Sequence, residues 1–371
     1  MAKPKTDFTA EDRRFMRRAL RLARRGLGWT RPNPAVGAVI VKEGRIIGEG
    51  FHRRAGEDHA EIVALKSCRE SPRGAAIYVT LEPCGHFGRT PPCSHALAKA
   101  GIRRVYFGSP DPNPVTAGKG LRYLRQKGVE VIHGPLSEEA DWLNGPYFTW
   151  VKEGRPLVTA KWAMTLDGKI ATRTGQSRWI SGPEARRLVH QLRAEVDAIL
   201  VGTNTVLRDN PLLTCRIRGG RNPVRIVLDR RLRLSEELRI FGPEAATILV
   251  TSCSKLRGAK AKRLARKGIQ LLGVAEKKGR LNLRRLLELL GKQGFHHLLV
   301  EGGGETVAGF LQDGLLDRIL VFIAPRIFGG KQAPGPVGGR GVGAPDAAWR
   351  FRLREIRRVG KDLALWFSKE S

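Results

Sequence analysis

Apolar positions in the first 135 residues follow two periods, that of helices and that of strands. Residues 11–26 place Phe15, Met16, Ala19 and Leu20 on one stripe and seven arginines mostly on the other side, which predicts an amphipathic helix. The expected strands are 36–41, 45–49, 75–81, 103–108 and 129–132, and the expected helices are 60–68, 92–100 and 118–127. This alternation predicts a layered α/β domain with helices on a central sheet.

A second alternating series begins at residue 157. Residues 146–156, bounded by prolines, are interpreted as the connection, so the expected domains are 1–150 and 151–371. Residues 331–345 are rich in Gly and Pro, which predicts a loop. The expected strands are 157–163, 197–201, 224–228, 247–251, 269–273, 297–300 and 317–324, the expected helices are 183–194, 255–266, 282–291 and 305–313, and 351–359 and 363–367 are expected to pair antiparallel.

Composition narrows the class of protein. No stretch approaches the roughly 20 apolar residues of a membrane span, and residues 1–8 lack the apolar core of a signal peptide. Five cysteines do not make a disulfide framework, so we expect a cytoplasmic protein. The net charge of +32 is spread over both halves and is expected to attract phosphorylated substrates. It would also attract RNA, so charge alone does not choose between them.

Metal-ligand side chains gather in the first half, at His59, Glu61, Cys84 and Cys93. One imidazole and two thiolates hold zinc in three of its four tetrahedral positions and leave the fourth for water. Bound zinc lowers the pKa of that water from about 15.7 to roughly 7. Glu61 as a fourth ligand would fill the open position, so we expect it to be the catalytic acid–base group. The set is typical of zinc-dependent nucleobase deaminases and predicts one zinc per chain, held by His59, Cys84 and Cys93.

Alternatives remain at this point. Eight residues separate the cysteines, where the general deaminase pattern has two, and His86 and His95 are rival ligands. Cys84 and Cys93 also suit a buried apolar role without metal. The same zinc set fits a deaminase acting on tRNA or another nucleic acid, with the second half as a binding domain. A zinc-stabilised interaction protein is a third hypothesis, which Glu61 beside an open coordination position disfavours.

Residues 81–93, LEPCGHFGRTPPC, closely resemble one deaminase family, the bifunctional riboflavin-biosynthesis enzymes, in which a pyrimidine deaminase is fused to a reductase. The resemblance covers almost the whole chain. It implies a cytidine-deaminase-like three-layer α/β domain followed by a dihydrofolate-reductase-like domain. It also implies hydrolytic deamination of 2,5-diamino-6-(5-phosphoribosylamino)pyrimidin-4-one and then NADPH-dependent reduction of the ribosyl group to ribityl. The other matching segments are PNP at 32–34, VG at 36–37, GEDHAE at 56–61, DPNP at 111–114, LDGK at 166–169 and EGGG at 301–304.

In the second half, residues 302–304 alone suit either a tight turn or a cofactor loop. Glycines before a helix let backbone N–H groups approach phosphate, but Val307 occupies the third glycine position of the dinucleotide fingerprint. The resemblance implies a cofactor loop. The NADPH contacts it implies are Ala163, Trp179, Thr205, Asp209, Gly303, Gly304, Glu305, Thr306, Val307, Ala308 and Gly309, and the substrate contacts are Ser177, Arg193, Leu213, Arg216 and Glu301.

Three further points concern ligands of the second half. Arg193 and Arg216 suit a dianionic phosphate, which a planar guanidinium binds through two hydrogen bonds. Asp209 is the carboxylate we expect near the reacting sugar. Arg230 stands where the family commonly has a small polar residue, so the chain departs from the family at one cofactor position. The expected partners are a small phosphorylated pyrimidine and further copies of this chain, with neither a specific nucleic acid nor a membrane.

Overall fold

The computed structural model describes residues 8–87 and 91–370, and the chain divides into two compact units, Met1–Gly154 and Arg155–Ser371. Residues 1–7 of the segment tested for a signal peptide, and residues 88–90 of the 81–93 segment, lie outside the described residues. Among the residues described, no helix combines the length and the apolar character needed to cross a bilayer.

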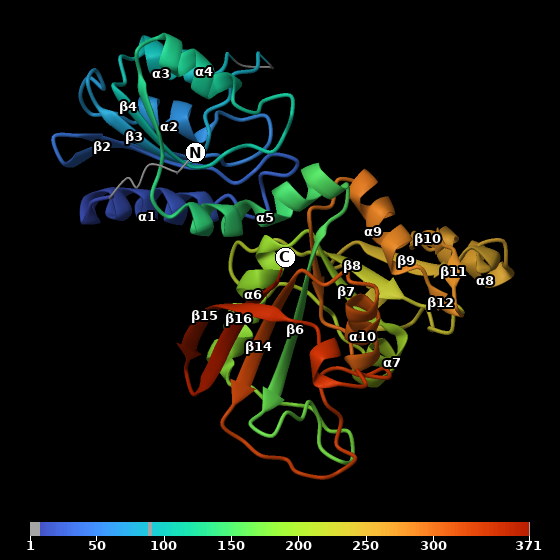
Figure 1. The fold of residues 1–371 in the computed structure, drawn as a ribbon. Helices are drawn as coiled ribbons and strands as arrows, with labels where there is room; N and C mark the ends of the chain where they lie inside the picture. Colours follow the sequence, from blue (N-terminus) through green and yellow to red (C-terminus); the bar gives the residue numbers. More distant parts are fainter. Residues whose placement is uncertain (1–7, 88–90, 371) are drawn as a thin grey trace. The chain divides into compact units, whose positions relative to one another are not determined.

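The first unit is a five-stranded sheet between two layers of helices (Figure 1). The strand order is β2-β1-β3-β4-β5; β3, β4 and β5 are parallel, and β1 is antiparallel to both neighbours. One apolar core joins the sheet to α2, α3 and α4, and another joins it to α1 and α5. The elements are α1 (Ala10–Arg24), β1 (Gly37–Lys42), β2 (Arg45–Phe51), α2 (Ala60–Lys66), β3 (Ala76–Leu81), α3 (Cys93–Lys99), β4 (Arg104–Ser109), α4 (Lys119–Gln126), β5 (Glu130–His133) and α5 (Ser137–Glu153).

The second unit is built on a nine-stranded sheet of order β10-β9-β8-β7-β13-β6-β14-β16-β15. The first seven strands are parallel, and β16 and β15 continue the sheet antiparallel. Its strands are β6 (Leu157–Thr165), β7 (Ala198–Gly202), β8 (Val224–Leu228), β9 (Thr247–Ser252), β10 (Gln270–Val274), β13 (His297–Val300), β14 (Arg318–Ala324), β15 (Phe351–Val359) and β16 (Asp362–Lys369).

Helices cover both faces of this sheet. Apolar residues of α9 and α10 pack on one face, and those of α6, α7 and α8 pack on the other. Covered faces are what a largely parallel sheet requires, because its strands are apolar on both sides. The helices are α6 (Pro183–Glu195), α7 (Thr203–Asp209), α8 (Ala259–Arg266), α9 (Leu283–Lys292) and α10 (Gly304–Gln312), with a short hairpin of β11 (Glu276–Lys277) and β12 (Arg280–Leu281) and 3₁₀ turns at Arg239–Phe241, Cys253–Lys255 and Pro345–Ala347.

The structure confirms the α/β class and the three-layer first unit, and it differs from the sequence-based expectation most clearly at α5. Residues 146–156 were expected to be a connection, but α5 runs through Pro146 to Glu153. Tertiary hydrogen bonds of Asn144 stabilise the helix. Its side chain accepts a hydrogen bond from the Ala35 N–H at 3.0 Å and donates one to the Ala35 carbonyl at 3.1 Å. Tertiary contacts here outweigh the loss of one helical hydrogen bond at proline.

Candidate active sites

His59, Cys84 and Cys93 converge in the first unit, with their ligand atoms all within 4.8 Å of one another. His59 is the N-cap of α2, Cys84 follows β3 and Cys93 opens α3. His59 Nδ1 lies 3.6 Å from Cys84 Sγ and 3.3 Å from Cys93 Sγ. A tetrahedral zinc with Zn–S of about 2.3 Å and Zn–N of about 2.0 Å has N···S edges of about 3.5 Å. The three side chains therefore fit zinc in both chemistry and spacing.

These groups perturb one another's protonation. The hydrogen bond with Cys93, opposed by burial and reinforced by His59, lowers the pKa of Cys84 to about 4. The contact with Cys84 in turn raises the pKa of His59 to about 9. The Cys93 N–H donates to Cys84 Sγ at 3.3 Å, which favours the thiolate. A thiolate is the form of cysteine that binds metal.

Glu61 lies in the first turn of α2, two residues from His59, and is only 3% exposed. Burial raises its pKa to about 7. Its position depends on how closely α2 packs on β2. A Cβ atom at Gly50 would come within 2.4 Å of the Ala60 carbonyl oxygen, and one at Gly48 within 2.5 Å of the Ala64 oxygen. Glycine at both positions lets the helix approach the sheet and place Glu61 beside the cysteines.

The two rival histidines lie outside this cluster in the part of the chain that is described. His86 is exposed, and His95 stacks on Tyr123 with ring centroids 3.6 Å apart. Among the described residues, His59 is the candidate histidine that lies with the two cysteines.

A pair that the sequence analysis did not single out, Asn33 and His52, lies next to the cluster. The His52 ring centroid is 5.3 Å from that of His59, and His52 is 2% exposed. His52 Nδ1 lies 3.1 Å from the Asp58 carbonyl oxygen and so donates to it, which leaves Nε2 to accept from the Asn33 amide at 3.0 Å. The matching 32–34 segment was the one available signal for this pair.

In the second unit, predicted reductase residues meet at the C-terminal ends of parallel strands. Ala163 lies on β6, Thr205 lies in α7 just after β7, and Glu301 directly follows β13. Ligands of open α/β sheets bind at such ends. The neighbouring strands β7, β13 and β6 bring together segments up to 140 residues apart in the chain.

Glu301 forms ion pairs with Arg193 and Lys161. Arg193 Nε and Nη2 donate to its two carboxylate oxygens at 3.0 and 2.9 Å, and Lys161 Nζ lies 3.1 Å from Oε2. All three side chains are largely buried: Arg193 is 13% exposed, Glu301 8% and Lys161 15%. Burial alone would raise the pKa of Glu301, but the charges of Arg193 and Lys161 outweigh it and lower the pKa to about 2.

The same contacts change the interpretation of Arg193. Its third nitrogen, Nη1, donates to the Thr214 carbonyl at 3.1 Å, so each of the three guanidinium nitrogens donates a hydrogen bond within the protein. These contacts orient the Arg193 guanidinium toward Glu301, and its contact with the substrate stays a prediction. Arg216 is exposed and forms no ion pair within the described residues. Lys161, which the sequence analysis missed, is the new member of this cluster.

The glycine turn joins β13 to α10. Gly303 is the N-cap of α10, and its N–H donates to Thr205 Oγ1 at 3.2 Å. Val307 and Ala308 are 1% and 2% exposed, so their side chains belong to the core and only their backbone can face a cofactor. The remaining turn residues, Gly304, Glu305, Thr306 and Gly309, lie in the first two turns of α10.

Each half of the chain matches the model of a known protein family. Residues 9–109 match the cytidine and deoxycytidylate deaminase zinc-binding region, and residues 156–365 match the RibD C-terminal domain. The chain is 45% identical to riboflavin biosynthesis protein RibD of Aquifex aeolicus over 96% of its length and 98% of the relative's. It is 42% identical to RibD of Escherichia coli, over 96% and 98%. The chain belongs to the RibD family.

Membership of the RibD family makes this chain a bifunctional enzyme of riboflavin biosynthesis, with a deaminase and a reductase domain and with zinc and NADPH as cofactors. The crystal structure of a diaminohydroxyphosphoribosylaminopyrimidine deaminase/5-amino-6-(5-phosphoribosylamino)uracil reductase from Thermotoga maritima superposes with a TM-score of 0.84 at 38% identity. That match covers 97% of this chain and 99% of the other. The sequence-based family assignment is confirmed, and a nucleic-acid deaminase is not favoured.

The remaining residues predicted for the reductase site lie in loops and at a helix end of the second unit. Trp179 is 60% exposed, and the Arg186 guanidinium lies 4.5 Å from its ring centroid. Ser177 is half-buried in the same loop, and Leu213 is 5% exposed. Asp209 ends α7, where its carbonyl accepts a hydrogen bond from Arg178 at 2.8 Å.

The Gly- and Pro-rich loop, residues 331–345, packs on the first turn of α10. The Gly338 N–H donates to the Gly304 carbonyl at 3.0 Å, and the Gly339 N–H donates to Glu305 Oε1 at 3.0 Å. The loop therefore lies against the glycine turn. Its composition alone did not predict this contact.

Proposed function

We propose that residues 1–154 deaminate 2,5-diamino-6-(5-phosphoribosylamino)pyrimidin-4-one and that residues 155–371 reduce the ribosyl group of the product to ribityl. The observation that carries the proposal is the convergence of His59, Cys84 and Cys93 beside buried Glu61, in a chain alignable end to end with a deaminase/reductase. Geometry supports the zinc chemistry, and the end-to-end similarity supports the substrate.

In the deaminase half, His59, Cys84 and Cys93 are the proposed zinc ligands. Zinc, when bound, supplies Lewis-acid activation of a water molecule. Glu61 is the proposed proton carrier, which takes a proton from the attacking water and delivers protons to the ring nitrogen and the departing ammonia. Water oxygen replaces the ring amino nitrogen, so the reaction needs no oxidant. Asn33, held by His52, is the proposed pyrimidine-facing amide.

In the reductase half, NADPH supplies the hydride, and the chain positions the reactants. Glu301 forms ion pairs with Lys161 and Arg193 directly after β13, and we propose that this cluster contacts the substrate's polar groups. Arg216 is the proposed phosphate-binding residue, because Arg193 is occupied by Glu301. Backbone N–H groups of the glycine turn are the proposed contacts for the cofactor's phosphates.

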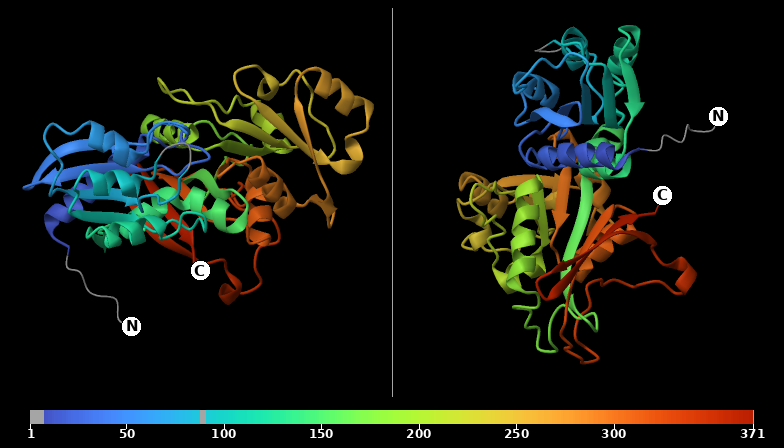
Figure 2. Two further views of the ribbon diagram at one scale, coloured as in Figure 1. Left: turned by 90° about the horizontal axis from the view of Figure 1, so that it is seen from above. Right: turned by 90° about the vertical axis from the view of Figure 1, so that its left-hand side faces the viewer.

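We also propose that the enzyme is a homo-oligomer in the cytoplasm. Strand β15 forms one edge of the nine-stranded sheet (Figure 2). Most of its residues are exposed, with Leu353 44% and Ile356 59% exposed, and Leu363 of β16 is 42% exposed. An exposed sheet edge with apolar side chains among its charged ones offers a surface for association. All five cysteines are free, as a reducing compartment would keep them. Sedimentation of Ile356→Lys beside the wild type tests the oligomer, and a shift to monomer is expected.

A single coupled assay tests the two activities. The full chain is given the diaminopyrimidine phosphate with and without NADPH, and both products are followed with ammonia release. We expect ammonia under both conditions and the ribityl product only with NADPH. Ammonia release from tRNA with none from the pyrimidine would instead establish the nucleic-acid deaminase.

A further inference from the structure

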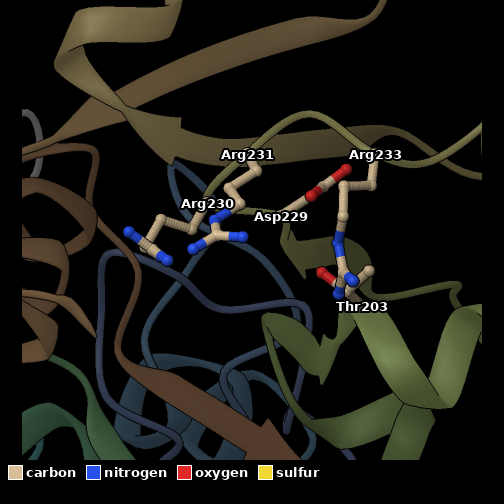
Figure 3. Close-up of a pocket in the computed structure, with 5 residues that line it drawn as sticks. All are labelled: Thr203, Asp229, Arg230, Arg231 and Arg233. Atoms are coloured by element: carbon tan, nitrogen blue, oxygen red, sulfur yellow. The ribbon is translucent and has the colours of Figure 1, made fainter. Parts of the chain in front are cut away.

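A basic pocket of about 170 Å³ opens at the C-terminal end of β8. Its lining residues are Thr203, Asp229, Arg230, Arg231 and Arg233 (Figure 3). A larger pocket of about 720 Å³ shares Thr203 and Arg230 with it and is also lined by Thr306 and Gly309 of α10, which are proposed cofactor contacts. The basic pocket therefore adjoins the site already described. A separate group of contacts, which the proposed function does not use, lies at the ends of β6 and β14.

The loop between β6 and α6, residues 166–182, carries Trp179. The indole is 60% exposed, so packing in the core does not hold it. Instead, the Trp179 carbonyl accepts a hydrogen bond from Arg326 Nη1 at 2.9 Å. Arg186 of α6, whose guanidinium lies over the indole, also donates through Nη1 to the Ser181 carbonyl at 2.9 Å. Two arginines from different elements therefore hold the backbone and the ring of Trp179.

Arg326 is itself fixed through its backbone. Strands β6 and β14 are parallel neighbours, so the loops that leave their C-terminal ends lie side by side. The Leu166 N–H, directly after β6, donates to the Arg326 carbonyl at 2.8 Å, and the Arg326 N–H donates to the Ala324 carbonyl at 2.7 Å. The exposed side chain of Arg326 thus reaches Trp179 from an anchored backbone.

Asp167 joins the same two loops through its carboxylate. Oδ1 accepts from Thr165 Oγ1 at 2.5 Å and from the Phe328 N–H at 3.2 Å, and Oδ2 accepts from the Gly329 N–H at 2.8 Å. The hydrogen bond from Thr165, together with those from the two backbone groups, lowers the pKa of Asp167. The ionised carboxylate therefore fixes the loop after β14 relative to the loop after β6.

The loop after β14 continues to the glycine turn. Its Gly338 and Gly339 N–H groups donate to the Gly304 carbonyl and to Glu305 Oε1, respectively. Trp179 and the glycine turn are both predicted to contact NADPH. Residues 326–339 therefore connect two parts of the proposed cofactor site.

We propose that Arg326 and Asp167 are positioning residues of the reductase. Arg326 holds Trp179 in the arrangement that binds NADPH, and Asp167 holds the loop that carries Arg326. Fixing a loop in its bound arrangement increases affinity, because less ordering is needed on binding. The inference rests on the proposed cofactor contact of Trp179. Both side chains act through backbone groups, and neither is proposed to touch the cofactor.

Equilibrium binding of NADPH to the full chain, with steady-state kinetics of both activities, tests the proposal. Arg326→Ala removes one hydrogen bond and should raise the Kd and the KM for NADPH about three- to tenfold. The KM for the pyrimidine substrate of the reductase should change less than about twofold, and deamination should not change. Arg326→Lys, which retains a donor, should recover most of the NADPH affinity.

Two further variants complete the series. Asp167→Asn should weaken NADPH binding to a similar degree, because an amide offers one acceptor oxygen in place of two. Arg257→Ala, an exposed arginine between the 3₁₀ turn at Cys253–Lys255 and α8, is the charge-matched control and should leave all values unchanged.

Trp179→Ala distinguishes failure of this inference from failure of the proposed site. If Trp179→Ala weakens NADPH binding and Arg326→Ala does not, the positioning role is wrong. If Trp179→Ala leaves NADPH affinity unchanged, the proposed cofactor contact is wrong, and this inference is wrong with it. A raised KM for the pyrimidine substrate with unchanged NADPH affinity in Arg326→Ala would assign the loop to the substrate through Ser177 and would also overturn the proposal.

Discussion

In residues 1–154, four reactive side chains carry out the proposed chemistry: His59, Glu61, Cys84 and Cys93. They lie at the starts of two helices and at the end of one strand. In residues 155–371, the cofactor supplies the hydride, and the chain contributes a glycine turn, a basic pocket and one buried ion-pair cluster. The two units therefore differ in what a substitution removes. In the first unit, a substitution removes a group that takes part in the reaction. In the second unit, it disturbs the positioning of the reactants or leaves a buried charge without its partner.

The largest expected effect separates the two units completely. Glu61→Gln should lower deamination by about 10²–10⁴-fold, because it removes the proton carrier, and should retain zinc, because Glu61 is not a proposed ligand. Reduction of pre-formed deaminated substrate should continue. Zinc content and the two activities are measured on one preparation. Loss of zinc in this variant, or zinc retention that depends on His86 or His95, would contradict the ligand assignment.

The corresponding change in the second unit should act on stability. Glu301→Gln leaves Arg193 and Lys161 as buried cations without a counter-charge, which is expected to lower the free energy of unfolding by about 3–5 kcal/mol. Denaturant unfolding measures this loss, and NADPH binding is measured separately on the same variant. Glu276→Gln breaks the more exposed pair with Arg230 and is the matched control, with a much smaller expected loss because water screens the pair. Equal losses would show that burial does not govern the pair.

This difference should depend on pH. Because the pKa of Glu301 is about 2 in the folded chain and about 4.3 in an unfolded one, its stabilisation is complete above about pH 4.5 and is lost as the pH falls toward 2. The gap in unfolding free energy between wild type and Glu301→Gln should therefore shrink between pH 6 and pH 3. A constant gap would indicate that the carboxylate is not held ionised by its partners.

A backbone change should disturb the first site without touching a ligand. A Cβ atom at Gly120 would lie 1.8 Å from the Pro83 carbonyl oxygen, so Gly120→Ala must move the turn that carries Cys84. Overpacking of this kind costs about 1–3 kcal/mol, and we expect weaker zinc retention in chelator competition. Gly343→Ala, in open surroundings, is the control. Unaltered zinc retention in Gly120→Ala would show that the turn adapts freely.

The smallest expected effect concerns the substrate's phosphate. Arg216→Ala should raise the KM for the phosphorylated substrate of the reductase about tenfold, the loss of one charge-assisted contact, with NADPH affinity unchanged. Arg193→Ala should instead lower stability, because Glu301 loses its bidentate partner. If Arg216→Ala loses NADPH affinity and retains its KM, Arg216 belongs to the cofactor site.

The elements predicted from the sequence were mostly right where periodicity was strong, and the misses have physical causes. Helix α5 was not predicted because proline is unfavourable inside a helix, and Pro146 lies within it. The hydrogen bonds between Asn144 and Ala35, 109 residues apart in the chain, stabilise the helix. Helix α8 begins at Ala259 rather than 255, after a 3₁₀ turn at Cys253–Lys255. The short helix α7 has too few residues for a periodic pattern.

The sequence by itself determined the order of strands and helices, the ligand-type residues and the family, because these depend on residue type and local spacing. The tertiary structure decided which residues meet. It brought Lys161 and Arg193 to Glu301 from separate elements, and it placed His86 and His95 outside the thiol cluster in the part of the chain that is described. The reason is that sheet order joins strands far apart in the chain, and no local pattern specifies that order.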